Sequence, residues 1–186
     1  MPENTDEKIA EDVQAGKTQA FGELVTRYEK KLSRYAKKFL FDHLESEDLV
    51  QEIFLKAFLN IQSFDTKRSF NSWVYRIAHN LFINEIKKKG KEPLPFFDPD
   101  TLFPHPTEPK KADDAIKEEE LQKMMNACLS KLSPKYREVM ILFYAEELSY
   151  EQISDILRIP ASTVGVRLSR AKKALKENYD KLYQGK

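Results

Sequence analysis

The chain has 186 residues, of which 41% are hydrophobic and 33% charged, which is enough apolar material for one or two small cores. Its 31 basic and 30 acidic side chains nearly cancel, so a uniformly basic coat for nucleic acid is excluded, although charge can still be segregated along the chain. One cysteine and five glycines, without the required spacings, exclude a disulfide framework, a multi-cysteine zinc site, a P-loop and a dinucleotide-binding turn.

The first half of the chain is predicted to be a bundle of helices, because its apolar residues recur at helical spacing. A short acidic helix is expected near residues 7–15. Three longer helices follow, with Ser46 as the expected N-cap of the second, and their apolar stripes cover residues 21–39, 49–61 and 70–86. No segment shows the alternating pattern of a strand followed by hairpin chemistry, so the predicted fold class is all-α.

The composition changes after the third stripe. Six of the nine prolines lie between residues 93 and 109, and proline at this density cannot propagate a helix or a central strand. Residues 92–120 contain nine acids and three lysines, a net charge of −6. Residues 92–112 are therefore predicted to be an extended, acidic, Pro-rich linker. Packing on a domain and docking into a partner both remain open for its large apolar residues, Phe96, Phe97, Leu102 and Phe103.

The linker divides the chain into two small helical domains, predicted at residues 1–91 and 113–186. Residues 65–91 carry a net charge of +5 and residues 158–186 a net charge of +6, so each domain ends in a basic segment. Two basic patches joined by an acidic tether indicate two contact sites on one polyanion. No apolar run is long enough to span a membrane, and the acidic N-terminus does not resemble a secretory signal, so a cytoplasmic protein without membrane insertion is expected.

The second domain is predicted to contain helices at about residues 114–131, 134–146, 150–157 and 160–182. Ser149 is the expected N-cap of the third helix, and a tight turn precedes the fourth. This is the pattern of a helix-turn-helix, whose second helix enters the major groove of DNA. An ordinary helical hairpin with a solvated basic face is the alternative. The side chains predicted to contact duplex DNA lie away from the buried stripe: Ser162, Thr163, Val166, Arg167, Ser169, Arg170 and Lys173.

A second surface is predicted on the helix of residues 49–61, on the side away from its apolar stripe. Acids, a glutamine and two leucines alternate there at helical spacing, which is typical of a partner surface. A solvated helix with two stray leucines is the alternative. The residues of this surface are Asp48, Gln51, Glu52, Leu55 and Leu59.

A third region is a short basic loop that runs into a helix dense in aromatic and polar residues. Aromatic rings interleaved with cations provide stacking faces and phosphate contacts for single-stranded nucleic acid. Trp73 lies on the buried stripe, whereas Tyr75 is expected to be exposed, and His79 has no neighbours at metal-ligand spacing. The candidate contacts are Phe64, Lys67, Arg68, Tyr75, Arg76 and Asn80.

With these three pieces in this order, the chain resembles a sigma-70 family initiation factor of the small extracytoplasmic-function class. Residues 48–58 are similar to the polymerase-binding helix of that family, residues 70–80 to its promoter-melting helix, and residues 132–139 with the helix-turn-helix to its C-terminal domain. Two departures stand out: Gly165 and Val166 replace a polar pair, and lysines replace the usual arginines after residue 84.

The resemblance implies a role for each surface. Asp48, Gln51, Glu52, Leu55 and Leu59 would dock on the largest catalytic subunit of core RNA polymerase. The basic loop, with Tyr75 and Asn80, would take a base flipped out of the −10 element. Val166, Ser169 and Arg170 would face the −35 element.

The protein is then expected to be a non-enzymatic initiation factor without cofactor or metal, monomeric when free, with core RNA polymerase and promoter DNA as partners. Whether an anti-sigma factor is a further partner stays open. The alternative function is a stand-alone helix-turn-helix regulator, which would leave the surface of residues 48–59 unexplained. A DNA enzyme with a C-terminal helix-turn-helix would need a nucleophile on a core of strands, for which the sequence has no pattern.

Overall fold

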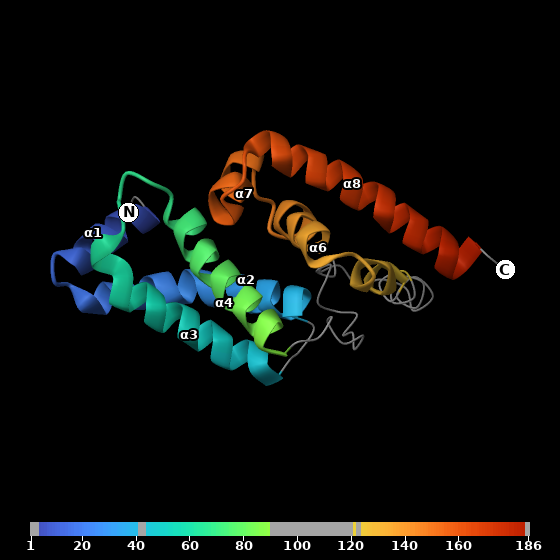
Figure 1. The fold of residues 1–186 in the computed structure, drawn as a ribbon. Helices are drawn as coiled ribbons and strands as arrows, with labels where there is room; N and C mark the ends of the chain where they lie inside the picture. The colour runs from blue at the N-terminus through green and yellow to red at the C-terminus, as the bar shows by residue number, and fades with distance from the viewer. Residues whose placement is uncertain (1–3, 41–43, 90–120, 122–123, 185–186) are drawn as a thin grey trace, which may run out of the picture.

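The computed structural model describes residues 4–40, 44–89, 121 and 124–184. The backbone in these ranges is helical and includes no strand, which confirms the all-α class. The helices form two groups, one from each half of the chain (Figure 1). The predicted linker at 92–112 lies outside the described residues, so the domain boundaries stay predictions. Among the residues described, no helix combines the length and the hydropathy needed to cross a membrane.

The N-terminal group follows the predicted stripes closely. Thr5 caps its first helix, where the Thr5 Oγ1 accepts from the backbone N–H of Lys8 at 3.2 Å. The third helix begins at Leu44, so Ser46 lies inside it and the predicted cap is wrong. The helices and short 3₁₀ turns of this group are α1 (Asp6–Gln14), η1 (Thr18–Ala20), α2 (Phe21–Leu40), α3 (Leu44–Asn60), η2 (Ile61–Ser63) and α4 (Phe70–Lys89).

The core of this group forms around the apolar stripe of α2, which packs on both α3 and α4. Tyr28, Leu32, Tyr35 and Phe39 on this stripe are all buried. The ring of Tyr35 meets that of Phe82 on α4 edge to face, with centroids 5.1 Å apart, an arrangement that stabilises beyond the area it buries. The aromatic stripe therefore fixes α4 against α2.

The C-terminal group contains the predicted helix-turn-helix. Ser149 and Gln152 form a capping box at the start of its first helix, so the predicted N-cap is confirmed. Arg158 ends that helix in the left-handed region, at φ 52°, which makes the tight turn. Residues 124–130 are also helical. The remaining elements are α6 (Pro134–Met140), the π turn η4 (Ile141–Ala145), α7 (Tyr150–Leu157), α8 (Ala161–Tyr179) and the π turn η5 (Asp180–Gln184).

The π turn η4 replaces the last part of the helix predicted over residues 134–146. Its i→i+5 hydrogen bond joins the N–H of Glu146 to the carbonyl of Ile141 at 3.0 Å. The chain then turns at Glu147, which has φ 54°, and enters α7.

The two helix groups are packed against each other. Helix α7 lies on α4, and η4 contacts α2 (Figure 1). Buried residues from both groups belong to one continuous hydrophobic cluster. The periodicity of the sequence predicts two separate domains on a tether, and it gives no indication that the two groups pack together. The interface between the two groups is called the seam.

Candidate nucleic-acid interface

The predicted duplex-binding face of α8 is open to solvent. Val164, Leu168 and Ala171 are buried and hold the helix on α6 and α7. Val166 on the opposite side is 48% exposed. The row on this side combines hydroxyls and cations that can hydrogen-bond to base edges and phosphates. Thr163 and Arg167 are half-buried, and the exposed residues on this side are Ser162, Val166, Ser169, Arg170 and Lys173.

Gly165 lies within α8, on the side that faces Tyr150 at the start of α7. A methyl group at this position would lie 3.4 Å from Cε2 of Tyr150, an ordinary van der Waals contact. Glycine inside a helix is about 1 kcal/mol less favourable than alanine. The packing of the chain itself therefore does not require glycine at position 165.

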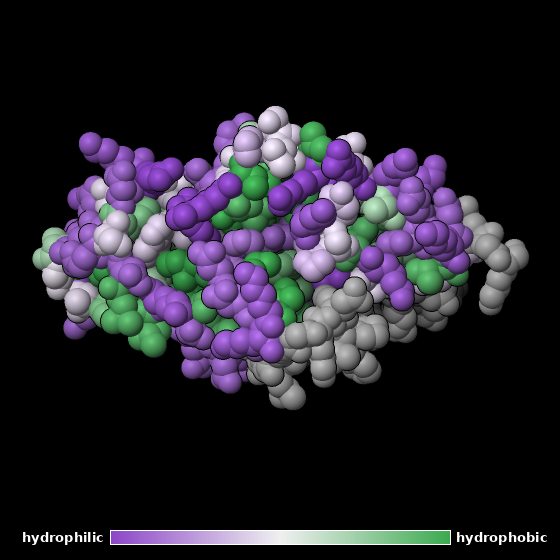
Figure 2. All heavy atoms as spheres, in the orientation of Figure 1, coloured by the Kyte–Doolittle hydropathy of each residue, from purple (hydrophilic) through white to green (hydrophobic). Residues whose placement is uncertain are grey.

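The outer face of α3 is exposed as predicted. Leu55 is 58% and Leu59 68% exposed, which is unusual for leucines on a helix that already buries another face. Asp48 and Gln51 are exposed beside them, and Glu52 forms an ion pair with Lys56 at 3.3 Å. Hydrophilic side chains cover most of the molecular face drawn in Figure 2, with apolar side chains in patches between them. The α3 face thus combines apolar area with acids that a basic, partly apolar partner would match.

Helix α1 holds the basic loop that precedes α4. The side-chain amide of Gln14 donates to the carbonyls of Ile61 and Phe64 at 2.7 and 2.8 Å. The carboxylate of Glu7 accepts from the N–H of Phe70 at 3.0 Å, at the helix N-terminus where negative charge is favoured. Sequence reasoning missed both residues, because their partners lie far along the chain.

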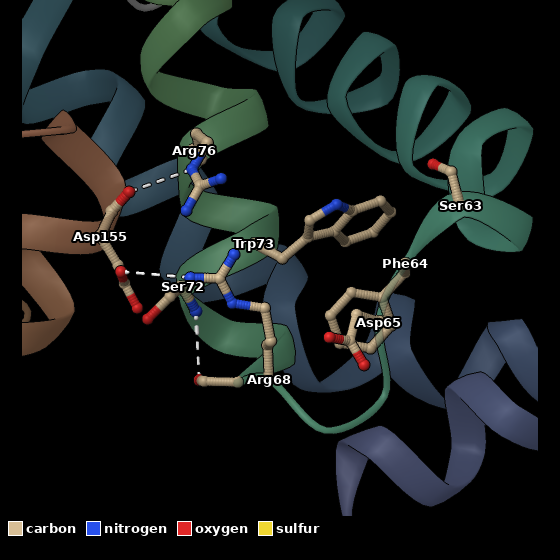
Figure 3. Close-up of a pocket in the computed structure, with 9 residues that line it drawn as sticks. Ser63, Phe64, Asp65, Arg68, Ser72, Trp73, Arg76 and Asp155 are labelled. Atoms are coloured by element: carbon tan, nitrogen blue, oxygen red, sulfur yellow. Dashed lines mark hydrogen bonds and ion pairs between the residues drawn. The ribbon is translucent and has the colours of Figure 1, made fainter.

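The loop and the first turns of α4 line a pocket of about 190 Å³ (Figure 3). The ring of Phe64 is buried and meets that of Trp73 at 5.0 Å between centroids, so the two aromatic side chains form one wall. Arg68 and Arg76 line the opposite part of the pocket. Aromatic surface and cations around a small cavity suit an unstacked base with its phosphate.

Tyr75 does not lie where the sequence predicts it. The prediction that Tyr75 is exposed is wrong: its side chain is 1% exposed, and its hydroxyl donates to Glu146 Oε2 at 2.7 Å. Burial raises the pKa of the Tyr75 hydroxyl well above its usual range, with the charge of Glu146 adding to the effect. The ring of Tyr75 packs against that of Tyr35 on α2, and Glu146 of the C-terminal group accepts from its hydroxyl; helical periodicity within α4 reveals neither contact. Of the other candidates, Lys67, Arg68 and Asn80 are exposed and Arg76 is half-buried.

Glu146, which follows η4, is the centre of the seam between the groups. Its carboxylate accepts two hydrogen bonds from Arg34 on α2, from Nε and Nη2 at 2.9 Å each, in addition to that from Tyr75. The side chain of Glu146 is 1% exposed, and its hydrogen bonds to Arg34, together with its charge, raise the pKa of Arg34. This is a bidentate Arg–carboxylate pair, the strong and directional form of ion pair.

Glu138 on α6 is a second buried carboxylate in the seam. It accepts from the hydroxyl of Tyr35 at 2.9 Å and contacts Nδ1 of His79 on α4. Burial raises the pKa of Tyr35 well above its usual value, and Glu138 adds to this effect. His79 is thus engaged by a single carboxylate, and within the described ranges no group of three or more His, Cys, Asp and Glu is arranged to hold a metal ion.

Lys38 on α2 lies buried near the same seam. Its Nζ atom has no hydrogen-bond partner among the residues that the structure describes, and burial lowers the pKa of its ammonium to about 8, although the charge of Glu146 partly opposes this. The seam therefore contains a cation whose charged form is disfavoured.

Asp155 on α7 also lines the pocket. Its backbone carbonyl accepts from Nε of Arg76 at 3.0 Å, and its carboxylate lies 3.6 Å from Nη2 of Arg68 (Figure 3). A residue of the C-terminal group thus lines a pocket that is otherwise built from the loop and α4.

Comparisons with known families match both halves of the chain. The family model Sigma-70 region 2 matches residues 24–92, and that of Sigma-70, region 4, matches residues 122–175. The chain is 35% identical to the ECF RNA polymerase sigma factor SigW of Bacillus subtilis, over 91% of this chain and 94% of the relative. It is 32% identical to the ECF RNA polymerase sigma-E factor of Escherichia coli K12, over 92% of each chain.

Two solved structures share the arrangement of the helices. The sigma factor RpoE of Bartonella quintana, in complex with the anti-sigma factor NepR, has a TM-score of 0.64 at 27% identity, over 85% of this chain and 95% of that one. CnrH, in complex with the cytosolic domain of CnrY, has a TM-score of 0.71 at 22% identity, over 96% and 99% of the two chains, and shows likeness of fold alone.

Proposed function

The chain belongs to the extracytoplasmic-function class of the sigma-70 family and is a sigma factor of transcription initiation. From that premise, we propose that it binds core RNA polymerase in the cytoplasm and directs it to promoters with one contact in each domain. The C-terminal domain reads a −35 duplex, and the N-terminal domain captures a −10 single strand and so promotes melting. The protein acts through binding and not through catalysis.

The exposed row of α8 is the observation that carries this proposal. The helix-turn-helix holds α8 so that Val166, Ser169 and Arg170 project away from the core. An arginine on such a face can bind O6 and N7 of guanine through two hydrogen bonds, and serine can reach a base or a phosphate. The geometry supports reading of a duplex in its major groove.

The pocket beside Trp73 supports capture of a single strand. A flipped base needs an aromatic surface for stacking, and its phosphate needs a cation. Trp73 and the loop supply the first, and Arg68 and Arg76 the second. Lys67 and Asn80 are exposed nearby in sequence and can extend the contact along the strand.

The outer face of α3 supports docking on the polymerase. Asp48, Gln51 and Glu52 provide polar contacts beside the exposed side chains of Leu55 and Leu59. A face of this kind fits a basic, partly apolar helical surface of a catalytic subunit.

An anti-sigma factor is a further proposed partner. The related sigma factor of Bartonella quintana was solved in complex with one, and this chain shares its fold at 27% identity over most of its length. We expect a complex of this kind to hold the free protein until a signal releases it.

The test is run-off transcription by core RNA polymerase on a promoter library, with and without the protein. Transcripts that start at a defined subset of promoters, only when the protein is present, are the expected result. Low-nanomolar, sequence-specific binding of duplex DNA by the isolated chain, without effect on core polymerase, would favour a stand-alone regulator instead.

A further inference from the structure

We propose that the C-terminal domain is a built-in inhibitor of the −10 pocket: it docks on the face of α4 that would receive the single strand, and Asp155 takes the place of a DNA phosphate. This inference rests on the proposed function and adds the regulation of that site. It concerns the free protein, before polymerase and promoter are bound.

Asp155 makes the contacts that a strand would make. Its carboxylate lies against Arg68, and its carbonyl accepts from Arg76. Carboxylate and phosphate oxygens both form charge-assisted hydrogen bonds with guanidinium groups, so they compete for the same donors. Figure 3 shows Asp155 reaching both arginines from the C-terminal group, with Trp73 and Phe64 on the far side of the pocket.

Two buried carboxylates hold the C-terminal group in this position. Glu146 accepts hydrogen bonds from Arg34 and Tyr75. Glu138 accepts one from the hydroxyl of Tyr35 and contacts His79. In each case the acceptor comes from the C-terminal domain and the partner from the N-terminal domain. Buried carboxylates are stable only when they are well paired, so these contacts indicate a specific interface and not a chance meeting of two tethered domains.

The closed arrangement covers one DNA surface and leaves the others free. Glu146, after η4, accepts from Tyr75, and Asp155 on α7 accepts from Arg76, so the C-terminal domain and a −10 strand cannot occupy this face together. The exposed side of α8 and the outer face of α3 stay open to solvent in the same structure. The polymerase can therefore dock on the closed form, and opening of the seam can follow docking. The open state gains population only through ligands that bind it better than the closed one.

Charge reversal across the seam tests this inference in the full-length protein. Arg34→Glu places a carboxylate against Glu146 and is expected to open the seam, and the double variant Arg34→Glu with Glu146→Arg restores the opposite charges. Lys30→Glu is the matched control, because Lys30 is exposed on the same helix. Asp155→Asn, at a half-exposed side chain, removes only the charge that faces Arg68.

Two readouts separate opening from DNA binding. Trp73 is the single tryptophan and lines the pocket, so quenching of its fluorescence by acrylamide reports whether the pocket is covered. The DNA probe is a labelled single strand that carries the −10 sequence of a promoter found by run-off transcription. Circular dichroism confirms that each variant is folded.

In Arg34→Glu, Trp73 quenching is expected to rise and affinity for the strand to increase about tenfold, the effect of releasing a mostly closed population. Asp155→Asn should increase strand affinity by a smaller factor. The double variant should return both readouts toward wild type, and Lys30→Glu should leave both unchanged.

Unchanged quenching and unchanged strand affinity in folded Arg34→Glu and in Asp155→Asn would overturn the inference, while core-dependent transcription would still support the proposed function. If quenching rises but no variant binds the strand, the pocket is not a −10 site. The proposed role of the pocket then fails, and the inference fails with it.

Discussion

Lys38 is an unusual residue because its buried ammonium finds no hydrogen-bond partner within the described ranges, and such a group destabilises the fold that contains it. Its pKa is lowered to about 8 in the folded protein, from a usual value of 10.5. Between these two pH values the unfolded chain binds more protons than the folded one, so stability rises with pH in this window. Tyr28, Tyr35 and Tyr75 oppose this trend only above their unfolded pKa near 10, where their raised pKa values let the unfolded chain ionise first.

From pH 7.5 to pH 9.5, the free energy of unfolding is expected to increase by about 1–2 kcal/mol through Lys38. The measurement is urea unfolding followed by circular dichroism across this range. Lys38→Met should be more stable than wild type at pH 7 and should lack the rise. An equal rise in both proteins would mean that another group titrates.

Gly165 gives a second test at the scale of single residues. Gly165→Ala should stabilise the protein by about 0.5–1 kcal/mol, because the added methyl group fits beside Tyr150 and alanine favours the helix. Thermal or urea unfolding measures the change. If the variant is more stable but loses −35-dependent transcription, the glycine serves close approach of DNA. If it is less stable, the packing described between α7 and α8 is wrong.

At the scale of elements, variants of helix α8 should distinguish recognition of bases from general electrostatic attraction to DNA. Arg170→Ala removes a candidate bidentate guanine contact and should reduce −35-dependent transcription about 10- to 100-fold, equivalent to about 1–3 kcal/mol. Run-off transcription on base-substituted promoters should show that preference at one base position is lost.

Lys176→Ala, six residues further along α8, is the control, and it should weaken binding evenly without changing base preference. Transcription from a template with a pre-melted −10 region should survive Arg170→Ala. An equal loss on both templates would show that Arg170 does not read the −35 element.

The proposed role of α3 in binding the polymerase can be tested separately. Replacing Asp48 and Glu52 by lysine should abolish binding to core RNA polymerase, while helicity and thermal unfolding stay nearly unchanged, because both residues are exposed and the Glu52–Lys56 pair is a surface pair. Pull-down with core polymerase and circular dichroism measure the two effects. Core affinity within about twofold of wild type would remove this face from the interface.

The elements were largely predictable because each buries one face at helical spacing. The stripes of α2, α3 and α4 and the cap at Ser149 are local patterns, and the structure confirms them. Ser46 failed as a cap because α3 continues through it to Leu44. Tyr75 failed as an exposed residue because its partners, Tyr35 on α2 and Glu146 in the other domain, lie far from it along the chain.

At the scale of the whole molecule, the seam could not be predicted from periodicity. Arg34 and Glu146 are 112 residues apart, and neither lies in a motif. One local signal was available: Glu138 is an acid next to the buried residues Val139 and Leu142, where a carboxylate needs a partner. That signal indicates a buried contact but does not identify the partner, so the closed arrangement required the structure.

The π turn between α6 and α7 determines on which side of the helix Glu146 lies relative to Glu138. In an uninterrupted α-helix, residues eight positions apart point about 80° away from each other. The wider turn over Ile141–Ala145 advances each residue by a smaller angle, which brings Glu138 and Glu146 round to the same side. The number of residues in this turn, and not only their chemistry, then determines whether both carboxylates reach their partners.

Inserting an alanine after Tyr144 should therefore act differently from replacing Tyr144. The insertion adds one residue to the turn and rotates Glu146 out of phase by about 100°. Tyr144→Ala keeps the phase, and because Tyr144 is 46% exposed it should leave the seam closed. Acrylamide quenching of Trp73 should rise only in the insertion variant, and the same quenching in both would mean that the length of this turn does not set the register of the two domains.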